Sequence, residues 1–207
     1  MEMITLVLGE LGTNCYILDC GNNQVVAIDI GGTPQKVLNI LKTENLNLKA
    51  ILLTHGHYDH VAGVESVRQA TGAEVYIHEK DAIMLESGKA NLAYQLSSEI
   101  YQPVQKYQVA QAGDILEIGN LEIQVMHTPG HTSGSVCYII GNQMFCGDTI
   151  FKGSIGRTDL GGNVSDMKKS LQKIARLAQD YELYPGHFYS STLAIEKKQN
   201  PYLRDFI

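Results

Sequence analysis

Histidine and aspartate side chains cluster in one short stretch that could bind a metal ion. Residues 54–60 contain His55, His57, Asp59 and His60, directly after an apolar segment that we expect to be a buried strand. A loop after a strand can direct several side chains to one point, and imidazole and carboxylate groups suit zinc, iron or manganese. Three histidines and an aspartate this close together favour a metal site over the alternative of a polar surface loop.

Three further candidates each follow an expected strand. They are His131, Asp148 and His187, and each alone could be a solvated or capping polar residue. With the first cluster they make five histidines and two aspartates, which exceeds the four ligands of one closed tetrahedral site. Two ions about 3.5–4 Å apart, sharing a carboxylate, can activate water at neutral pH. The residues themselves therefore indicate a metal-dependent enzyme and favour hydrolysis. Of the other two histidines, we expect His78 to cap a helix and His127 to pack or cap near the same edge.

Alternating and buried apolar runs predict the elements that position these residues. The expected strands are 3–8, 14–20, 24–30, 48–53, 74–77, 115–118, 121–126, 135–140, 143–146 and 181–184. The expected helices are 34–43 with Thr33 as N-cap, 61–70, a segment around 80–86, one capped by Ser165, and one from about Thr192. Residues 87–112 have no clear period and are predicted to form a long loop.

The chain also contains a weak internal repeat. A strand, a tight turn and a strand ending near an aspartate occur at residues 15–29 and again at 137–148. Chance could produce this match, because turn sequences recur. Two strand-rich halves with helices outside predict an α+β fold of two face-to-face sheets covered by helices on both sides.

Composition limits the remaining classes. The chain has 207 residues, 44% hydrophobic and 18% charged, and a net charge of −6. We expect one globular domain over 1–207 and no nucleic-acid partner, which would need a basic face. There is no apolar run long enough for a membrane span, and we expect no signal peptide. The four cysteines lack metal or disulfide spacing, so we expect buried, reduced thiols in a cytoplasmic protein.

The order of residues 54–60, His131, Asp148 and His187 resembles the metallo-β-lactamase superfamily over nearly the whole chain. The resemblance implies an αββα sandwich of two mixed sheets with the metal site at their rim. It implies that His55, His57 and His131 bind a first metal. It implies that Asp59, His60 and His187 bind a second, with Asp148 bridging the two. Asp59 would also orient a bridging hydroxide. Zinc is the expected metal, with iron and manganese as alternatives.

Within that superfamily, residues 147–159 and 196–203 resemble the single-domain glyoxalase II-like (hydroxyacylglutathione hydrolase-like) group. Zinc β-lactamases differ in lacking the aspartate that Asp148 would supply. The C-terminal helical domain that binds glutathione in full-length glyoxalase II is expected to be absent. Arg157 occupies the place of a basic residue near the thiol, and is a candidate substrate anchor or a surface ion pair. Asp159 replaces a tyrosine, and Phe188-Tyr189 replaces the usual glycine and proline.

The resemblance implies hydrolysis of a thioester, such as S-acylglutathione or a related thiol ester, by a bridging hydroxide on a dinuclear centre. The expected partner is this small molecule, with the oligomeric state open. One alternative is another ester or lactone hydrolase. A second is a persulfide dioxygenase-like oxidoreductase, with one iron on His55, His57 and either Asp148 or His131. A third is a metal-binding protein without catalysis.

Overall fold

The first half of the chain forms a six-stranded sheet. The computed structural model describes residues 3–98 and 100–206. The strands of this sheet are, in spatial order, β1 (Met3–Leu8), β2 (Thr13–Asp19), β3 (Gln24–Ile28), β4 (Asn47–Leu52), β5 (Glu74–His78) and β6 (Gln108–Ala110). The first three strands pair antiparallel, and the last three are added in parallel. Parallel strands require crossover connections, and these carry the helices on this side.

The second half builds another six-stranded sheet, in the spatial order β14-β13-β10-β9-β8-β7. Its strands are β7 (Ile115–Ile118), β8 (Leu121–His127), β9 (Val136–Ile140), β10 (Gln143–Gly147), β13 (Glu182–Pro185) and β14 (Ser191–Thr192). The only parallel pair in the described part of this sheet is β10 with β13, so β8, β10 and β13 all run in one direction. A separate small hairpin is formed by β11 (Ile150–Phe151) and β12 (Ser154–Ile155).

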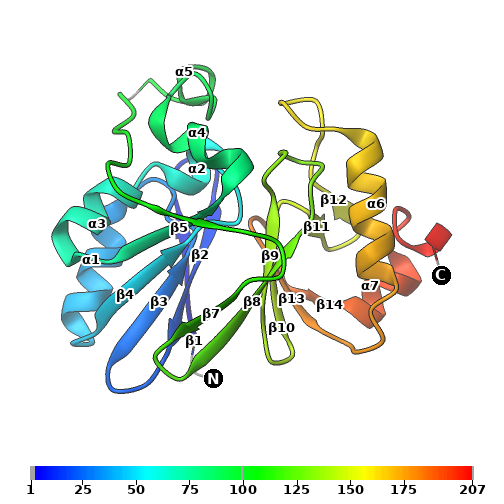
Figure 1. The fold of residues 1–207 in the computed structure, drawn as a ribbon, viewed down its shortest axis with the longest axis horizontal. Helices are drawn as coiled ribbons and strands as arrows, with labels where there is room; N and C mark the ends of the chain where they lie inside the picture. The colour runs from blue at the N-terminus through cyan, green and yellow to red at the C-terminus, as the bar shows by residue number, and fades with distance from the viewer. Residues whose placement is uncertain (1–2, 99, 207) are drawn as a thin grey trace.

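Helices cover the outer face of each sheet, and Figure 1 shows α1 and α3 on one side and α6 and α7 on the other. The helices are α1 (Pro34–Thr43), α2 (Tyr58–Val61), α3 (Val64–Thr71), η1 (Glu79–Asp81), α4 (Ala82–Glu86), α5 (Ala93–Leu96), α6 (Val164–Ala175), α7 (Leu193–Gln199) and η2 (Arg204–Phe206). Side chains such as Leu52, Tyr138 and Phe145 fill the space between the sheets. Two further apolar clusters join each sheet to its helices. The predicted αββα sandwich is confirmed.

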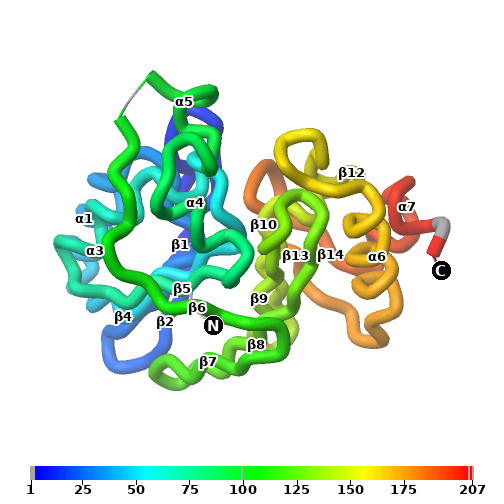
Figure 2. Tube along the Cα trace, turned by 45° about the horizontal axis from the view of Figure 1, so that its top comes forward, coloured from blue at the N-terminus to red at the C-terminus, as the bar shows by residue number. Residues whose placement is uncertain are grey.

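The connection between the halves differs from the prediction. Figure 2 shows the chain passing from α5 by way of β6 to β7. Residues 87–112 were expected to be loop, but they contain α5 and β6. A four-residue helix and a three-residue strand are too short to show a period, and β6 depends on pairing with β5.

Helix ends also differ from the sequence prediction. The predicted helix 61–70 is divided into α2 and α3. Asn163, not Ser165, caps α6, because its side chain accepts a hydrogen bond from the Asp166 amide. Thr33 precedes α1 with φ 61°, and its hydroxyl accepts from the Gly9 amide instead of capping the helix.

Other local predictions are confirmed. The His78 imidazole accepts a hydrogen bond from the Lys80 amide and so caps η1, and the His127 ring stacks on it at 4.2 Å. All four cysteines are free and buried. In residues 3–98 and 100–206, no helix combines the length and apolarity needed to cross a bilayer.

Candidate metal centre

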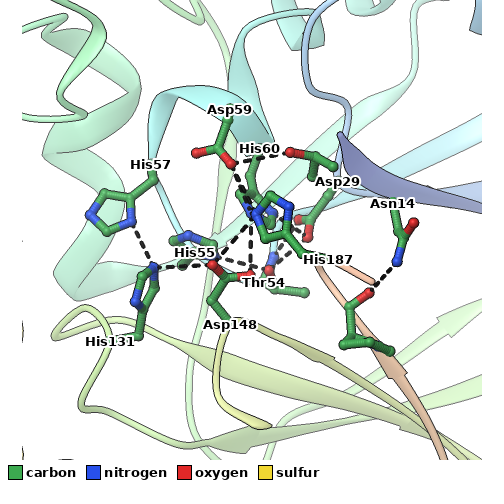
Figure 3. Close-up of polar contacts among 12 residues, drawn as sticks. Asn14, Asp29, Thr54, His55, His57, Asp59, His60, His131, Asp148 and His187 are labelled. Carbon is green, nitrogen blue, oxygen red and sulfur yellow. Dashed lines mark hydrogen bonds and ion pairs between the residues drawn. The ribbon is translucent and has the colours of Figure 1, made fainter. Parts of the chain in front are cut away.

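The seven predicted ligands lie together where strands of both sheets end (Figure 3). His55 and His57 follow β4, and Asp59 and His60 lie in the short helix α2. The other three follow β8, β10 and β13, and they are His131, Asp148 and His187. These three strands run in one direction, so their carboxyl ends meet at the same edge of the sheet. The topology therefore gathers side chains that lie up to 132 residues apart, from His55 to His187.

The side chains form two groups of three that match the two predicted ligand sets. In the first group, His55, His57 and His131 have nitrogen atoms within 4.8 Å of one another, and His57 Nδ1 lies 2.8 Å from His131 Nε2. The second group contains Asp59, His60 and His187. In that group, His187 Nε2 lies 3.1 Å from Asp59 Oδ2 and 3.3 Å from His60 Nε2.

Asp148 lies between these groups. It forms a third set with His55 from the first group and His60 from the second. One carboxylate oxygen lies 3.4 Å from His60 Nε2, and the other lies 3.5 Å from His131 Nε2. This is the position expected of a carboxylate shared by two ions.

Backbone carbonyls orient two of the imidazoles. His131 Nδ1 donates to the Arg157 carbonyl at 2.7 Å, and His57 Nε2 donates to the Leu160 carbonyl at 3.3 Å. A carbonyl oxygen can only accept, so the outer nitrogen of each ring carries the proton of this hydrogen bond. The inner nitrogen of each ring is therefore the one that could bind a metal ion.

Asp29 and Thr54 orient two more of the five histidines, His60 and His55. The Asp29 carboxylate contacts His60 Nδ1 at 2.8 Å and accepts from the Thr54 hydroxyl at 2.7 Å and the Thr54 amide at 2.8 Å. The Thr54 hydroxyl uses its single O–H to donate a hydrogen bond to Asp29. Its oxygen can therefore only accept a hydrogen bond from His55 Nδ1, which lies 3.2 Å away. The His55 Nε2 lone pair then faces the cluster. In the sequence, Asp29 stands out only as the end of the internal repeat, although an aspartate at the end of an expected strand is a usable signal.

Two buried polar atoms show that the cluster fits a cation. Within residues 3–98 and 100–206, His55 Nε2 and Asp148 Oδ1 are buried without a hydrogen-bond partner. Such atoms are costly unless something pairs with them. A cation held in the cluster would give these atoms a partner.

The charge of the site also favours a cation. Burial lowers the pKa of His55, and burial together with His131 lowers that of His57 to about 4, so both imidazoles are neutral at pH 7 and could accept a metal ion. Burial opposes ionisation of Asp59 and Asp148, but the neighbouring His60 lowers the pKa of each carboxyl. Burial likewise opposes a charge on His60, yet Asp59, Asp29 and Asp148 raise its pKa. The ionised carboxylates therefore create a field that attracts positive charge, as a dinuclear metal site requires.

Asp81 is a buried carboxylate that sequence analysis missed. It accepts hydrogen bonds from the Gly56 amide, the Thr132 hydroxyl and the Gly134 amide. Gly56 separates two predicted ligands, and Thr132 follows a third. Asp81 thus ties together the loops that carry the first ligand group. Nothing in the residues around position 81 signals this contact, because it joins segments distant in the chain.

A cleft of about 760 Å³ opens beside the cluster, and six of its lining residues are His57, Asp59, His131, Asp148, Arg157 and His187. The Arg157 guanidinium is exposed and forms two hydrogen bonds, of 2.7 and 2.6 Å, with Asp159. The structure thus shows the ion pair that was one of the two expectations for Arg157. Its use as a substrate anchor stays a prediction.

Comparison with known proteins agrees with this geometry. Residues 8–187 match the family model described as the metallo-beta-lactamase superfamily. The hydroxyacylglutathione hydrolase GloC of Haemophilus influenzae is 32% identical, over 92% of this chain and 92% of that protein. The probable metallo-hydrolase YqgX of Bacillus subtilis is 31% identical, over 100% of this chain and 99% of that protein.

Solved structures show the same fold. The BLEG-1 B3 metallo-beta-lactamase superposes with a TM-score of 0.89 at 34% identity, over 98% of this chain and 99% of that one. TTHA1623 in a di-iron-bound form superposes with a TM-score of 0.86 at 33% identity, over 97% and 100% of the two chains. On its family match, its fold and its ligand cluster, the chain belongs to the metallo-β-lactamase superfamily.

Proposed function

We propose that this protein is a metal-dependent hydrolase that cleaves the thioester of a small thiol, such as an S-acylglutathione. One observation carries the proposal: at the side of an open cleft, Asp148 lies between a group of three histidines and a group of one aspartate and two histidines. The relative named hydroxyacylglutathione hydrolase supports the thioester as substrate. The partner is a small molecule, with no role for nucleic acid or a membrane.

The reaction adds water across the thioester. The carbonyl carbon gains a C–O bond and loses its C–S bond, and the products are a carboxylic acid and a thiol. When bound, two divalent ions would polarise the carbonyl oxygen and lower the pKa of the attacking water. Asp59 lines the cleft, and the Thr13 hydroxyl donates to its Oδ2 at 3.1 Å. This fixed carboxylate would orient the water toward the carbonyl. The thiolate is a good leaving group, so no strong general acid is required of the chain.

The donor set defines which metals suit the site. Imidazole and carboxylate groups bind zinc, iron and manganese. We propose zinc as the resident metal, and the di-iron form of TTHA1623 makes iron the first alternative to examine.

A thioester panel tests the proposed function. Purified protein is loaded with zinc, iron or manganese and assayed with S-lactoyl- and S-acetylglutathione, while thiol release is measured. We expect turnover that is abolished in Asp148→Asn and retained in Asp166→Asn, whose carboxylate pairs with Lys169 on the surface. A β-lactam is assayed in parallel, because BLEG-1 is described as a β-lactamase. Turnover of the β-lactam alone would contradict the proposal.

A further inference from the structure

The segment that carries His187 is held rigidly by strand β2. Asn14 is buried, and its side-chain amide donates to the carbonyls of Pro185 and Phe188, each at 3.0 Å. The Asn14 backbone amide donates to the Gly186 carbonyl at 2.7 Å, and the Tyr16 hydroxyl donates to Pro185 at 2.6 Å. Residues 185–188 therefore have a fixed backbone at the edge of the cleft.

Phe188 has an unusual conformation in this segment. Its φ of 65° is in the left-handed region, which is energetically costly for a residue with a large side chain and not for glycine. Its side chain is 72% exposed, so burial does not offset this cost. The ring meets Phe151 edge to face at 5.7 Å, and both rings lie 6.1–6.2 Å from the His187 imidazole. A strained conformation that directs an aromatic ring into a cleft points to a functional role.

Other apolar side chains lie with Phe188 along the cleft. Three aromatic side chains and one leucine, namely Phe151, Phe188, Tyr189 and Leu11, line the cleft that contains Asp59 and His187, and we call these four the aromatic wall. Leu11 is 50% exposed and Tyr189 is 79% exposed. Leu11 lies in the turn before β2, and β2 holds residues 185–188. Apolar side chains exposed inside a cleft indicate contact with an apolar ligand.

We propose that the aromatic wall binds a large apolar acyl group, aryl or branched, of the thioester substrate. This inference rests on the proposed thioesterase function and specifies its substrate class. The carbonyl carbon must reach the metal ligands, so the groups on either side of it extend along the cleft. Small biological thiols carry amides, carboxylates or hydroxyls, which an apolar wall does not recognise. The acyl group is therefore the part that matches the wall.

Two thioesters of one thiol test this selectivity. The phenylacetyl and acetyl thioesters of N-acetylcysteamine are assayed with metal-loaded protein, and the ratio of their kcat/KM values is measured. We expect a ratio of about ten or more in favour of phenylacetyl, the size of effect that aromatic contacts and apolar pockets give. Phe188→Gly, which suits the left-handed conformation and so keeps the fold, should lower this ratio about tenfold. Phe188→Tyr should keep it. Tyr202→Ala, an exposed aromatic residue that does not line the cleft, serves as the control and should also keep it.

A binding measurement separates this inference from the thioesterase function. Calorimetry with phenylacetate and acetate on the metal-loaded protein should show tighter binding of phenylacetate, and this preference should disappear in Phe188→Gly. A kcat/KM ratio near one, or an unchanged ratio in Phe188→Gly, would overturn the assignment. If neither thioester is cleaved, the proposed thioesterase function fails. Calorimetry alone then tests whether the aromatic wall binds an apolar group, and equal affinities for phenylacetate and acetate would overturn that role.

Discussion

The carboxylate of Asp81 accepts a hydrogen bond of 3.0 Å from the backbone amide of Gly56, the residue between His55 and His57. The same carboxylate accepts from the Thr132 hydroxyl at 2.6 Å and the Gly134 amide at 2.7 Å, next to His131. One buried side chain therefore joins the loop after β4 to the loop after β8. The relative position of the first three predicted ligands depends on this junction between the two sheets.

Replacing this carboxylate should weaken the fold. In Asp81→Asn, one acceptor oxygen becomes an amide donor that faces a backbone N–H, and leaving such a group unpaired costs about 1–3 kcal/mol. We expect the free energy of unfolding of the metal-free protein, measured in urea, to fall by about 2 kcal/mol. Glu117→Gln on an exposed strand position should change it by less than about 0.5 kcal/mol. Equal stability of the two variants would show that Asp81 does not join the loops.

The Thr54 hydroxyl should control metal affinity through His55. In Thr54→Val the side chain keeps its shape but loses the acceptor for His55 Nδ1 and the donor to Asp29. Removing such an outer partner typically lowers metal affinity about 10–100-fold. We expect a loss of this size in the metal affinity of Thr54→Val, measured by competition with a chromophoric chelator. Thr43→Val, exposed at the end of α1, is the matched control. An affinity within about twofold of the parent protein would be inconsistent with the hydrogen-bond chain.

His78 should make stability depend on pH in mildly acidic solution. Burial and the neighbouring His127 lower the pKa of His78 from 6.5 to about 4. As the pH falls, His78 therefore binds a proton in the unfolded chain at a higher pH than in the folded protein. The stability that the neutral His78 contributes to the folded state is present above pH 6.5 and is lost between pH 6.5 and 4. We expect this residue to account for up to about 2 kcal/mol of stability lost between pH 7 and 5. In the metal-free His78→Asn variant, the free energy of unfolding, expressed relative to its value at pH 8, should fall less steeply with pH than in the parent protein. Parallel curves for both proteins would refute this assignment.

Arg157 provides a test of substrate anchoring. Its guanidinium lines the cleft but is already paired with Asp159, and both side chains are more than half exposed. If Arg157 also binds an anionic substrate, Arg157→Ala should raise KM for an anionic thioester about three- to tenfold and leave KM for a neutral thioester unchanged. Lys168→Ala, exposed on α6, controls for the loss of one positive charge. An unchanged KM for the anionic thioester would leave Arg157 only its ion pair.

The gathering of the seven candidate ligands could be predicted from the sequence because each follows a strand or begins a helix next to one. Residue type and spacing identify His55, His57, Asp59 and His60 locally. His131, Asp148 and His187 are predicted only by adding that the carboxyl ends of their strands meet at one edge of the sheet. The two sheets were predicted because alternation and turn residues mark most of their strands.

The remaining features depend on contacts between distant segments. β6 exists through its pairing with β5, and the hydrogen bond that the Gly134 amide donates to Asp81 joins residues 53 positions apart. The sequence predicts Ser165 and not Asn163 as the cap of α6, because both are good capping residues and only the backbone conformation distinguishes them. The aromatic wall likewise depends on the hydrogen bonds by which β2 holds residues 185–188. These bonds join segments far apart in the chain, so no local sequence pattern predicts them.

The metal content of the protein tests the central claim most directly. The protein is purified without added metal, and its zinc, iron and manganese are counted per chain by elemental analysis. We predict close to two ions per chain, as the two ligand groups sharing Asp148 require. A single iron per chain, with no second metal of any kind, would contradict a dinuclear hydrolase and favour the one-iron oxidoreductase.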